Sequence, residues 1–307
     1  MIKENNLNFK GVWAKYNNYE IIKSADEFYI RPVKKSDYTI YDVCDVNKEL
    51  LVDFLLIGRE ILNYTNIRDI ECNLMSTESK YQELVLEFVK KYGLLGDLTY
   101  SPLNTKLISA GEVYLQGYSE INKLSANNYI KPFFIEDENI KNIDFNNGLN
   151  ENIIKYVYGD NNPTLFMPNQ VEDFNLVFSE CYTEKIARIL FYSKLLYKIF
   201  ESTENSIIEE NEDKKAIYQK YASEFTPNAI SFSFDFTNSK ISMDWQFNSL
   251  KQAMEIFLGL NEANDRKELK MCRHCGKPFI AKNIKSEYDS ISCRNIANVY
   301  KSREKNK

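Results

Sequence analysis

The 307-residue sequence predicts a protein of the α+β class: a mixed N-terminal body with a helical core, a β-hairpin and a C-terminal treble-clef-like zinc finger. Three observations lead to this prediction. Several segments place apolar residues at helical spacing, two segments near residue 240 alternate strictly between apolar and polar, and three cysteines lie within 22 residues near the C-terminus. We expect an N-terminal α+β region over 1–150, a helical region with the hairpin over 151–265, and a zinc-finger module with a basic helix over 266–307.

The N-terminal region is expected to contain strands followed by helices. Aromatic and β-branched residues indicate short strands at Tyr19–Ile22 and Tyr38–Val43. Apolar residues at helical spacing predict a helix over Asn47–Leu62 and a second over Thr77–Tyr92. Gly93 follows the second helix, and glycine commonly ends a helix in a left-handed cap.

The middle of the chain is less uniform in its patterning. Residues 97–150 are weakly patterned, and we expect a long loop there. Val171–Phe200 is apolar over more than one stripe, which predicts a central helix. The run Glu201–Asp213 holds six acidic residues and no Lys or Arg, so we expect an exposed loop after that helix.

The clearest local pattern is a hairpin over residues 230–247. Apolar residues alternate with polar ones in Ile230–Phe236 and again in Ile241–Phe247. Period-two patterning of this kind predicts two antiparallel strands with one aromatic face buried. Ser249 then stands where a helix N-cap is expected, before apolar residues at helical spacing: Leu250, Ala253, Met254, Phe257 and Leu258.

Composition and charge narrow the class of protein. The chain is 44% apolar and 27% charged, as is usual for soluble globular proteins. No apolar leader stands at the N-terminus, and the early apolar run Leu50–Leu62 is interrupted by charges, so it cannot span a bilayer. We expect a cytoplasmic protein without a membrane partner.

The charge is distributed unevenly along the chain. Residues 266–307 hold twelve Lys and Arg against four Asp and Glu, a net charge of +8. The whole chain carries −5, so residues 1–265 carry −13. A basic end on an acidic body indicates either a surface that binds polyanions or a tail that folds back on its own domain.

The C-terminal cysteines have the spacing of metal ligands. Cys272 and Cys275 form a C-x2-C knuckle followed by Gly276, and Asp289 and Cys293 lie four residues apart at the start of an expected helix. Zinc takes four tetrahedral ligands and prefers thiolates at structural sites, so the sequence predicts a Zn²⁺ site with these four ligands. Asp289 has a second interpretation, as the N-cap of the terminal helix.

The enzyme classes that we considered lack essential residues. His274 is the sole histidine and lies inside the knuckle, where we do not expect it to bind the metal. It cannot be both base and ligand in a nuclease of the HNH type. Neither a G-x4-G-K-[ST] phosphate loop nor a G-x-S-x-G motif occurs in the sequence. We therefore expect no enzyme, and a nuclease or hydrolase is the weaker alternative.

The C-terminal motifs resemble a known family. Cys272-x2-Cys275-Gly-Lys-Pro-Phe279, Tyr288-Asp289-Ser-x2-Cys293-Arg-Asn and a basic end look like the zinc fingers of bacterial proteins of the CGNR type, which are ABATE-like. Trp245-Gln-Phe247 and the following helix extend the resemblance over roughly residues 245–305. Asp289 replaces the family's third cysteine, and Cys293-Arg-Asn stands in place of Cys-Gly-Asn-Arg. The resemblance implies a zinc-binding, regulatory bacterial protein.

The expected terminal helix carries the candidate residues for binding nucleic acid. Arg294, Asn298, Lys301 and Lys305 fall on one helical stripe, suited to phosphates and a base edge. We expect a DNA-binding or other nucleic-acid-binding protein that regulates transcription. The alternative is an interaction or structural protein whose finger staples the C-terminus to the body, with a second copy or another protein as its partner.

Overall fold

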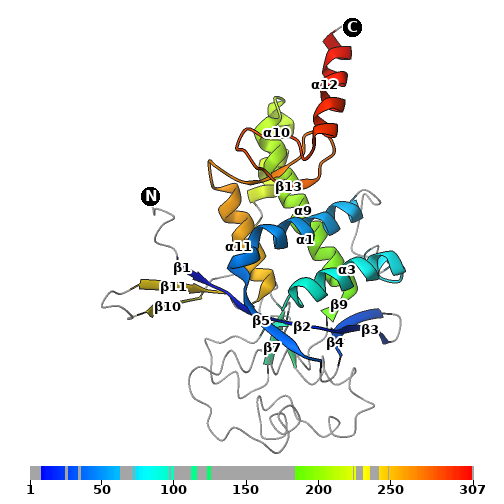
Figure 1. Ribbon diagram of the computed structural model, residues 1–307, viewed down its shortest axis with the longest axis vertical. Helices are drawn as coiled ribbons and strands as arrows, with labels where there is room; N and C mark the ends of the chain where they lie inside the picture. Colours follow the sequence, from blue (N-terminus) through cyan, green and yellow to red (C-terminus); the bar gives the residue numbers. More distant parts are fainter. Residues whose placement is uncertain are drawn as a thin grey trace, which may run out of the picture. The chain divides into compact units, whose positions relative to one another are not determined.

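The computed structural model shows a mixed α+β protein, which confirms the predicted fold class (Figure 1). It describes residues 8–24, 27–33, 36–62, 72, 74–96, 98–99, 112–115, 123–125, 184–223, 225, 231–235, 242–247 and 249–305. The chain forms two compact units, each assembled from three separate segments. Unit 1 comprises Met1–Asp45, Ser76–Ile186 and Asn228–Ala253, and unit 2 comprises Val46–Met75, Ala187–Pro227 and Met254–Lys307. The division into three regions stays a prediction.

The N-terminal strands of unit 1 form antiparallel pairs. β2 (Val12–Tyr16) pairs with β5 (Tyr38–Asp42), and β3 (Tyr19–Ser24) pairs with β4 (Glu27–Pro32). The strands predicted at residues 19 and 38 are thereby confirmed. The helix α3 (Ser79–Tyr92) packs on β2 and β3, as its apolar face requires.

The hairpin near residue 240 is also confirmed, and it gains a third strand. β10 (Ser231–Asp235) pairs antiparallel with β11 (Ser242–Gln246), and β1 (Asn8–Lys10) adds a parallel partner from the other end of the chain. Ser249 Oγ accepts a hydrogen bond from the Gln252 amide at 3.0 Å, so it is the predicted N-cap. The helix that follows is α11 (Leu250–Glu262).

Part of the region predicted as a loop forms a small sheet instead. β6 (Leu98–Thr99), β7 (Glu112–Leu115) and β8 (Lys123–Ser125) pair antiparallel in that order. The other residues of 97–150 lie outside the described part of the chain. Strands this short, without a regular alternation, give little signal in a sequence.

The turn after α3 is fixed by a buried carboxylate. Glu184 accepts hydrogen bonds from the amides of Leu95 and Gly96, at 2.9 and 2.7 Å. Gly93 has φ 91° and ψ 179°, so the left-handed helical cap predicted there is wrong, although the positive φ still requires glycine. A Cβ at Gly93 would lie 2.5 Å from the Ala14 carbonyl oxygen, which shows how closely the turn approaches β2.

The central helix differs from its prediction at both ends. Residues 171–183 of the predicted segment lie outside the described part, and Glu184–Lys185 form a strand, β9, that pairs with β4. The helix α9 runs over Ile186–Ile208, so it continues through the first part of the acidic run that was predicted to be a loop. A further helix, α10 (Glu212–Ser223), begins within the same run.

Unit 2 is built on the close approach of α9 to α1 (Asn47–Leu62), whose predicted bounds are confirmed. A Cβ at Gly58 would lie 2.0 Å from the Ser193 carbonyl oxygen, so only glycine allows the two helices to come this close. The rings of Phe54 and Tyr192 lie 5.7 Å apart in the same interface. Among the described residues, no helix has both the length and the apolar character needed to cross a membrane.

Candidate metal centre and terminal helix

The C-terminal module begins with a short hairpin around the cysteine knuckle. β12 (Leu269–Met271) pairs antiparallel with β13 (Pro278–Ile280). Between them the Cys272 amide donates to the Lys277 carbonyl, and the Gly276 amide donates to the Cys272 carbonyl, both at 2.8 Å. Gly276 has φ +71°, a conformation that glycine adopts without strain. The knuckle therefore folds as its sequence predicts.

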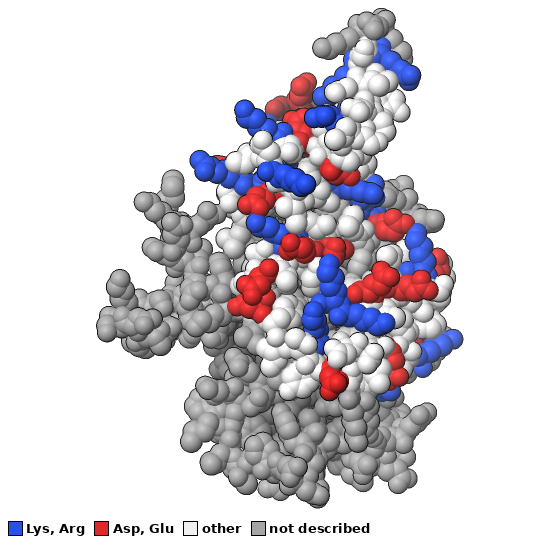
Figure 2. All heavy atoms as spheres, in the orientation of Figure 1, with Lys and Arg blue, Asp and Glu red and all other residues white. Residues whose placement is uncertain are grey.

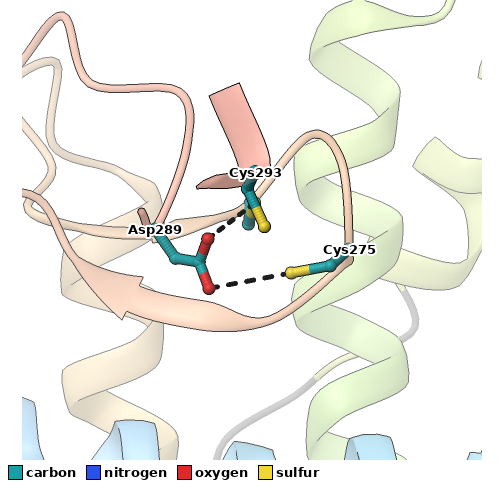
Figure 3. A group of neighbouring side chains, drawn as sticks. Cys275, Asp289 and Cys293 are labelled. Carbon is teal, nitrogen blue, oxygen red and sulfur yellow. Dashed lines mark hydrogen bonds between the residues drawn. The ribbon is translucent and has the colours of Figure 1, made fainter. Parts of the chain in front are cut away.

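The second pair of predicted ligands lies at the start of the terminal helix, α12 (Ile291–Lys305). Ser290 Oγ accepts a hydrogen bond from the Cys293 amide at 3.2 Å, so Ser290 caps the helix. The interpretation of Asp289 as the N-cap is therefore wrong. Its carboxylate faces the thiols, with 3.4 Å from Cys272 Sγ to Oδ1 and 3.7 Å from Cys275 Sγ to Oδ2 (Figure 3).

The structure brings all four predicted ligands together. The ligand atoms of Cys272, Cys275, Asp289 and Cys293 lie within 4.8 Å of one another, so the group could hold a metal ion. Zn–S bonds of 2.3 Å in tetrahedral geometry place ligand atoms about 3.8 Å apart. The two sulfur–oxygen distances of 3.4 and 3.7 Å already match this spacing, and the most widely separated ligand atoms would have to approach by at most about one ångström. Cys272 is buried and Asp289 is exposed, so the site has a solvent-facing edge.

Hydrogen bonds among the ligands set their protonation. The thiol of Cys293 holds the pKa of the Asp289 carboxyl below its usual range, and the carboxylate in turn raises the pKa of Cys293 to about 12. Burial raises the pKa of Cys275. Without a metal these two thiols keep their protons at neutral pH. Binding of a metal would replace those protons, so it would release protons into solution.

Two helices of unit 2 hold the knuckle by its backbone. Arg59 of α1 donates from Nη2 to the Cys275 carbonyl at 2.5 Å, and the Tyr197 hydroxyl of α9 donates to the Gly276 carbonyl at 2.8 Å. Burial raises the pKa of the Tyr197 hydroxyl, which keeps it protonated as a donor. The first ligand pair is thus anchored to the helices independently of its thiols.

The rest of the hairpin is anchored in the same way. The Glu204 carboxylate of α9 accepts from the Met271 amide at 3.1 Å and pairs with Lys267. The Asn261 side chain of α11 accepts from the Leu269 amide at 3.1 Å and donates to the Leu269 carbonyl at 3.0 Å. These hydrogen bonds are partly shielded from water, and together they hold the hairpin in a defined position.

The helix α12 has a different environment. Of its side chains that the structure describes, only Cys293 and Ala297 are half-buried, and the others are exposed. The ring of Tyr300 stacks on His274 of the knuckle, with centroids 6.1 Å apart and planes 28° apart. The His274 ring therefore packs against α12 and lies outside the group of four candidate ligands.

The candidate nucleic-acid residues lie together on this helix. Arg294, Asn298 and Lys301 are exposed, and Lys305 lies in the same helix, although its side chain is outside the described part. Over the stretch that α12 occupies, Lys and Arg side chains flank a broad white surface (Figure 2). Sequence reasoning missed the anchoring residues Arg59, Tyr197 and Glu204, since nothing in their local sequence indicates a contact with the finger.

Comparison with known protein families, with characterised proteins and with solved structures finds no match for this chain. The function therefore has to be argued from the geometry of the finger and its surroundings.

Proposed function

We propose that the C-terminal group binds zinc at a structural site. Three thiolates and one carboxylate suit Zn²⁺ better than the oxygen-preferring cations Mg²⁺ and Ca²⁺. Cys272 and Cys275 would hold the ion from the anchored knuckle, and Asp289 and Cys293 would hold it from the start of α12. The ion would supply a cross-link between these two parts of the chain.

Metal analysis of the purified protein tests this assignment. We expect one zinc per chain in the wild type and a weaker complex in Asp289→Ala, with affinity measured by competition against a chromogenic chelator. Ser290→Ala removes the neighbouring side chain that caps α12 and keeps the Asp289 carboxylate, so it is the matched control. Equal zinc affinity in wild type and Asp289→Ala would show that Asp289 is not a ligand.

We further propose that the protein binds nucleic acid through α12 and acts as a regulator in the bacterial cytoplasm. The observation that carries this proposal is the contrast within the finger: the hairpin is anchored to α1, α9 and α11, and α12 presents its basic stripe to solvent. Arg294, Lys301 and Lys305 would contact phosphates, and Asn298 would contact a base edge. The resemblance of residues 245–305 to CGNR-type proteins supports the regulatory role.

One set of contacts favours a second function. The bonds of Arg59, Tyr197 and Glu204 to the hairpin are those expected if the finger only fastens the C-terminus to unit 2. A finger that only fastens the C-terminus to unit 2 does not require a long exposed helix with a basic stripe, however. The staple is therefore the alternative, in which α12 makes no contact with nucleic acid.

Salt-dependent binding separates the two functions. Fluorescence anisotropy with a labelled duplex of random sequence should give binding that weakens steeply with salt. The affinity falls as salt rises, so the slope of log K against log salt is negative. In Arg294→Ala/Lys301→Ala/Lys305→Ala we expect its magnitude to decrease by about 2.7, since each lost phosphate contact removes ~0.9. The control Lys90→Ala/Lys214→Ala/Lys220→Ala removes the same charge from exposed positions outside the finger.

The outcomes are distinct. A shallower slope in the α12 variant alone supports nucleic-acid binding by this helix. Equal losses in both variants would mean that net charge, and not α12, determines the affinity. The absence of binding to duplex and single strands by the wild type at about 50 mM salt would leave the staple as the function.

A further inference from the structure

The helix α12 carries a second stripe that nucleic acid does not explain. Ile296, Val299 and Arg303 are spaced i, i+3 and i+7, so they lie along one side of the helix, opposite the stripe of Arg294 and Lys301. Ile296 is 41% exposed and Val299 is 49% exposed. Contacts with phosphates and base edges are mostly polar, so nucleic-acid binding does not explain exposed aliphatic side chains on this side of α12. A cation among exposed aliphatic residues indicates a protein partner with apolar and acidic surface.

Such a surface exists elsewhere in unit 2. The end of α9 exposes Ile207 and Ile208, and α10 exposes Ile217, with exposed fractions of 64%, 43% and 55%. The connection between these helices and the first two residues of α10 together form what we term the acidic turn, residues 209–213, which contains Glu209, Glu210, Glu212 and Asp213. No side chain of α10 is buried. Lys215, Tyr218 and Ala222 are half-buried along one face of the helix, and its other described side chains, Ile217 among them, are exposed.

The two surfaces are complementary in charge and in character. One combines aliphatic side chains with Arg303, and the other combines aliphatic side chains with four carboxylates, of which Glu212 also pairs with Lys215. Both belong to unit 2, and α10 and α12 lie at the same end of that unit in Figure 1. Within one chain both surfaces are exposed, so the contact is not made internally.

We propose that the protein forms a symmetric dimer in which the Ile296–Val299–Arg303 stripe of each copy docks on the acidic turn and its flanking isoleucines in the other copy. A two-fold axis repeats the contact, because each copy supplies one helix stripe and one acidic turn. Repetition doubles the buried area, which brings two small contacts toward the roughly 1,600 Å² of a standard interface. The stripe of Arg294 and Lys301 stays exposed, so the dimer is independent of the proposed nucleic-acid function.

Sedimentation velocity on the zinc-loaded full-length protein tests the dimer. We expect a monomer–dimer equilibrium in the wild type and a weakening of at least about tenfold in Ile296→Asp, which places a charge in the apolar contact. Ile296 is already part-exposed, so the fold should tolerate the change, and circular dichroism checks this. Lys282→Glu, at an exposed position of the finger outside α12, is the control and should dimerise like the wild type.

Charge exchange makes the test specific to these two surfaces. Arg303→Glu and Glu210→Lys/Glu212→Lys should each dimerise at least about tenfold more weakly, since like charges then face each other in both contacts. An equimolar mixture should recover the dimer, because in the mixed pair both contacts again join opposite charges. In an alternative dimer, in which the two α12 helices pair with each other, Glu210→Lys/Glu212→Lys would leave the dimer affinity unchanged.

Three results would overturn the proposal. The first is a wild type that stays monomeric up to about 100 µM. The second is a dimer that either charge variant leaves unchanged, which would place the interface elsewhere. The third is a mixture of the two charge variants that remains monomeric.

Discussion

The two halves of the C-terminal finger are held in different ways. The hairpin half, residues 267–280, is fixed by side chains of three helices that bond to its backbone or to Lys267: Arg59, Tyr197, Glu204 and Asn261. The helical half, α12, is joined to the hairpin by the candidate ligand group and by the Tyr300–His274 stack. The segment just before α12 is joined to the hairpin by the Arg273–Glu287 ion pair and by the Arg273 amide, which donates to the Glu287 carbonyl at 3.0 Å.

The difference indicates where the metal would act. The hairpin has enough hydrogen bonds to keep its place without an ion. The Arg273–Glu287 pair is exposed and adds little, about 0–1 kcal/mol, and an isolated helix of 15 residues is marginal in water. A metal bound by ligands of both halves would therefore fix the orientation of α12 relative to the hairpin.

The largest effect is expected from Cys272→Ser, which removes the buried ligand of the anchored half. Structural zinc sites provide about 10–16 kcal/mol over four ligands, so one lost ligand should weaken zinc on the order of 10²- to 10³-fold. Competition with a chelator measures this. Cys44→Ser, a thiol outside the ligand group, should bind zinc like the wild type. Equal affinity in all three proteins would contradict the metal site.

A smaller effect is expected where Arg59 anchors the knuckle. Arg59→Ala leaves the Cys275 carbonyl without this charged donor, which should lower the free energy of unfolding by about 1.5–3 kcal/mol in urea titrations. The control is Lys48→Ala. It breaks the pair with Glu268, in which both side chains are about half exposed, and should cost at most about 1 kcal/mol. Equal costs would mean that the knuckle is not anchored by Arg59.

The smallest effect is expected at the turn of the knuckle. Gly276→Ala forces a side chain into a positive φ, at about 1–2 kcal/mol, and brings a Cβ to 3.3 Å from the Tyr197 hydroxyl. Gly259→Ala in α11 meets no atom within 4 Å and should stabilise the protein by about 0.5–1 kcal/mol. Thermal unfolding compares the two. A stabilising Gly276→Ala would contradict the turn described for the knuckle.

Local patterns in the sequence predicted local structure well. The periodicities of Asn47–Leu62 and of the hairpin near residue 240 gave the correct elements, because each side of these elements has a distinct environment. The spacing of Cys272, Cys275, Asp289 and Cys293 likewise predicted a group of side chains that could hold a metal ion, since a knuckle and one helical turn fix their directions.

The errors arose where distant residues decide the structure. The acidic run was predicted as a loop, but Glu is a good helix former, and Glu204 is neutralised by Lys267 of the finger. Glu184 was expected inside a helix, but it lies in β9, and its carboxylate holds the turn after α3. Neither partner is near in the sequence, so no local pattern could have indicated them.

The central claim is that a metal joins the anchored hairpin of β12 and β13 to the exposed helix α12. Amide hydrogen exchange, compared between the zinc-loaded and the chelator-stripped protein, tests it most directly. Removal of the metal is expected to speed amide exchange in α12 by at least about tenfold while the amides of β12 and β13 change little. Equal loss of protection in the hairpin and the helix, or no loss in either, would contradict the account.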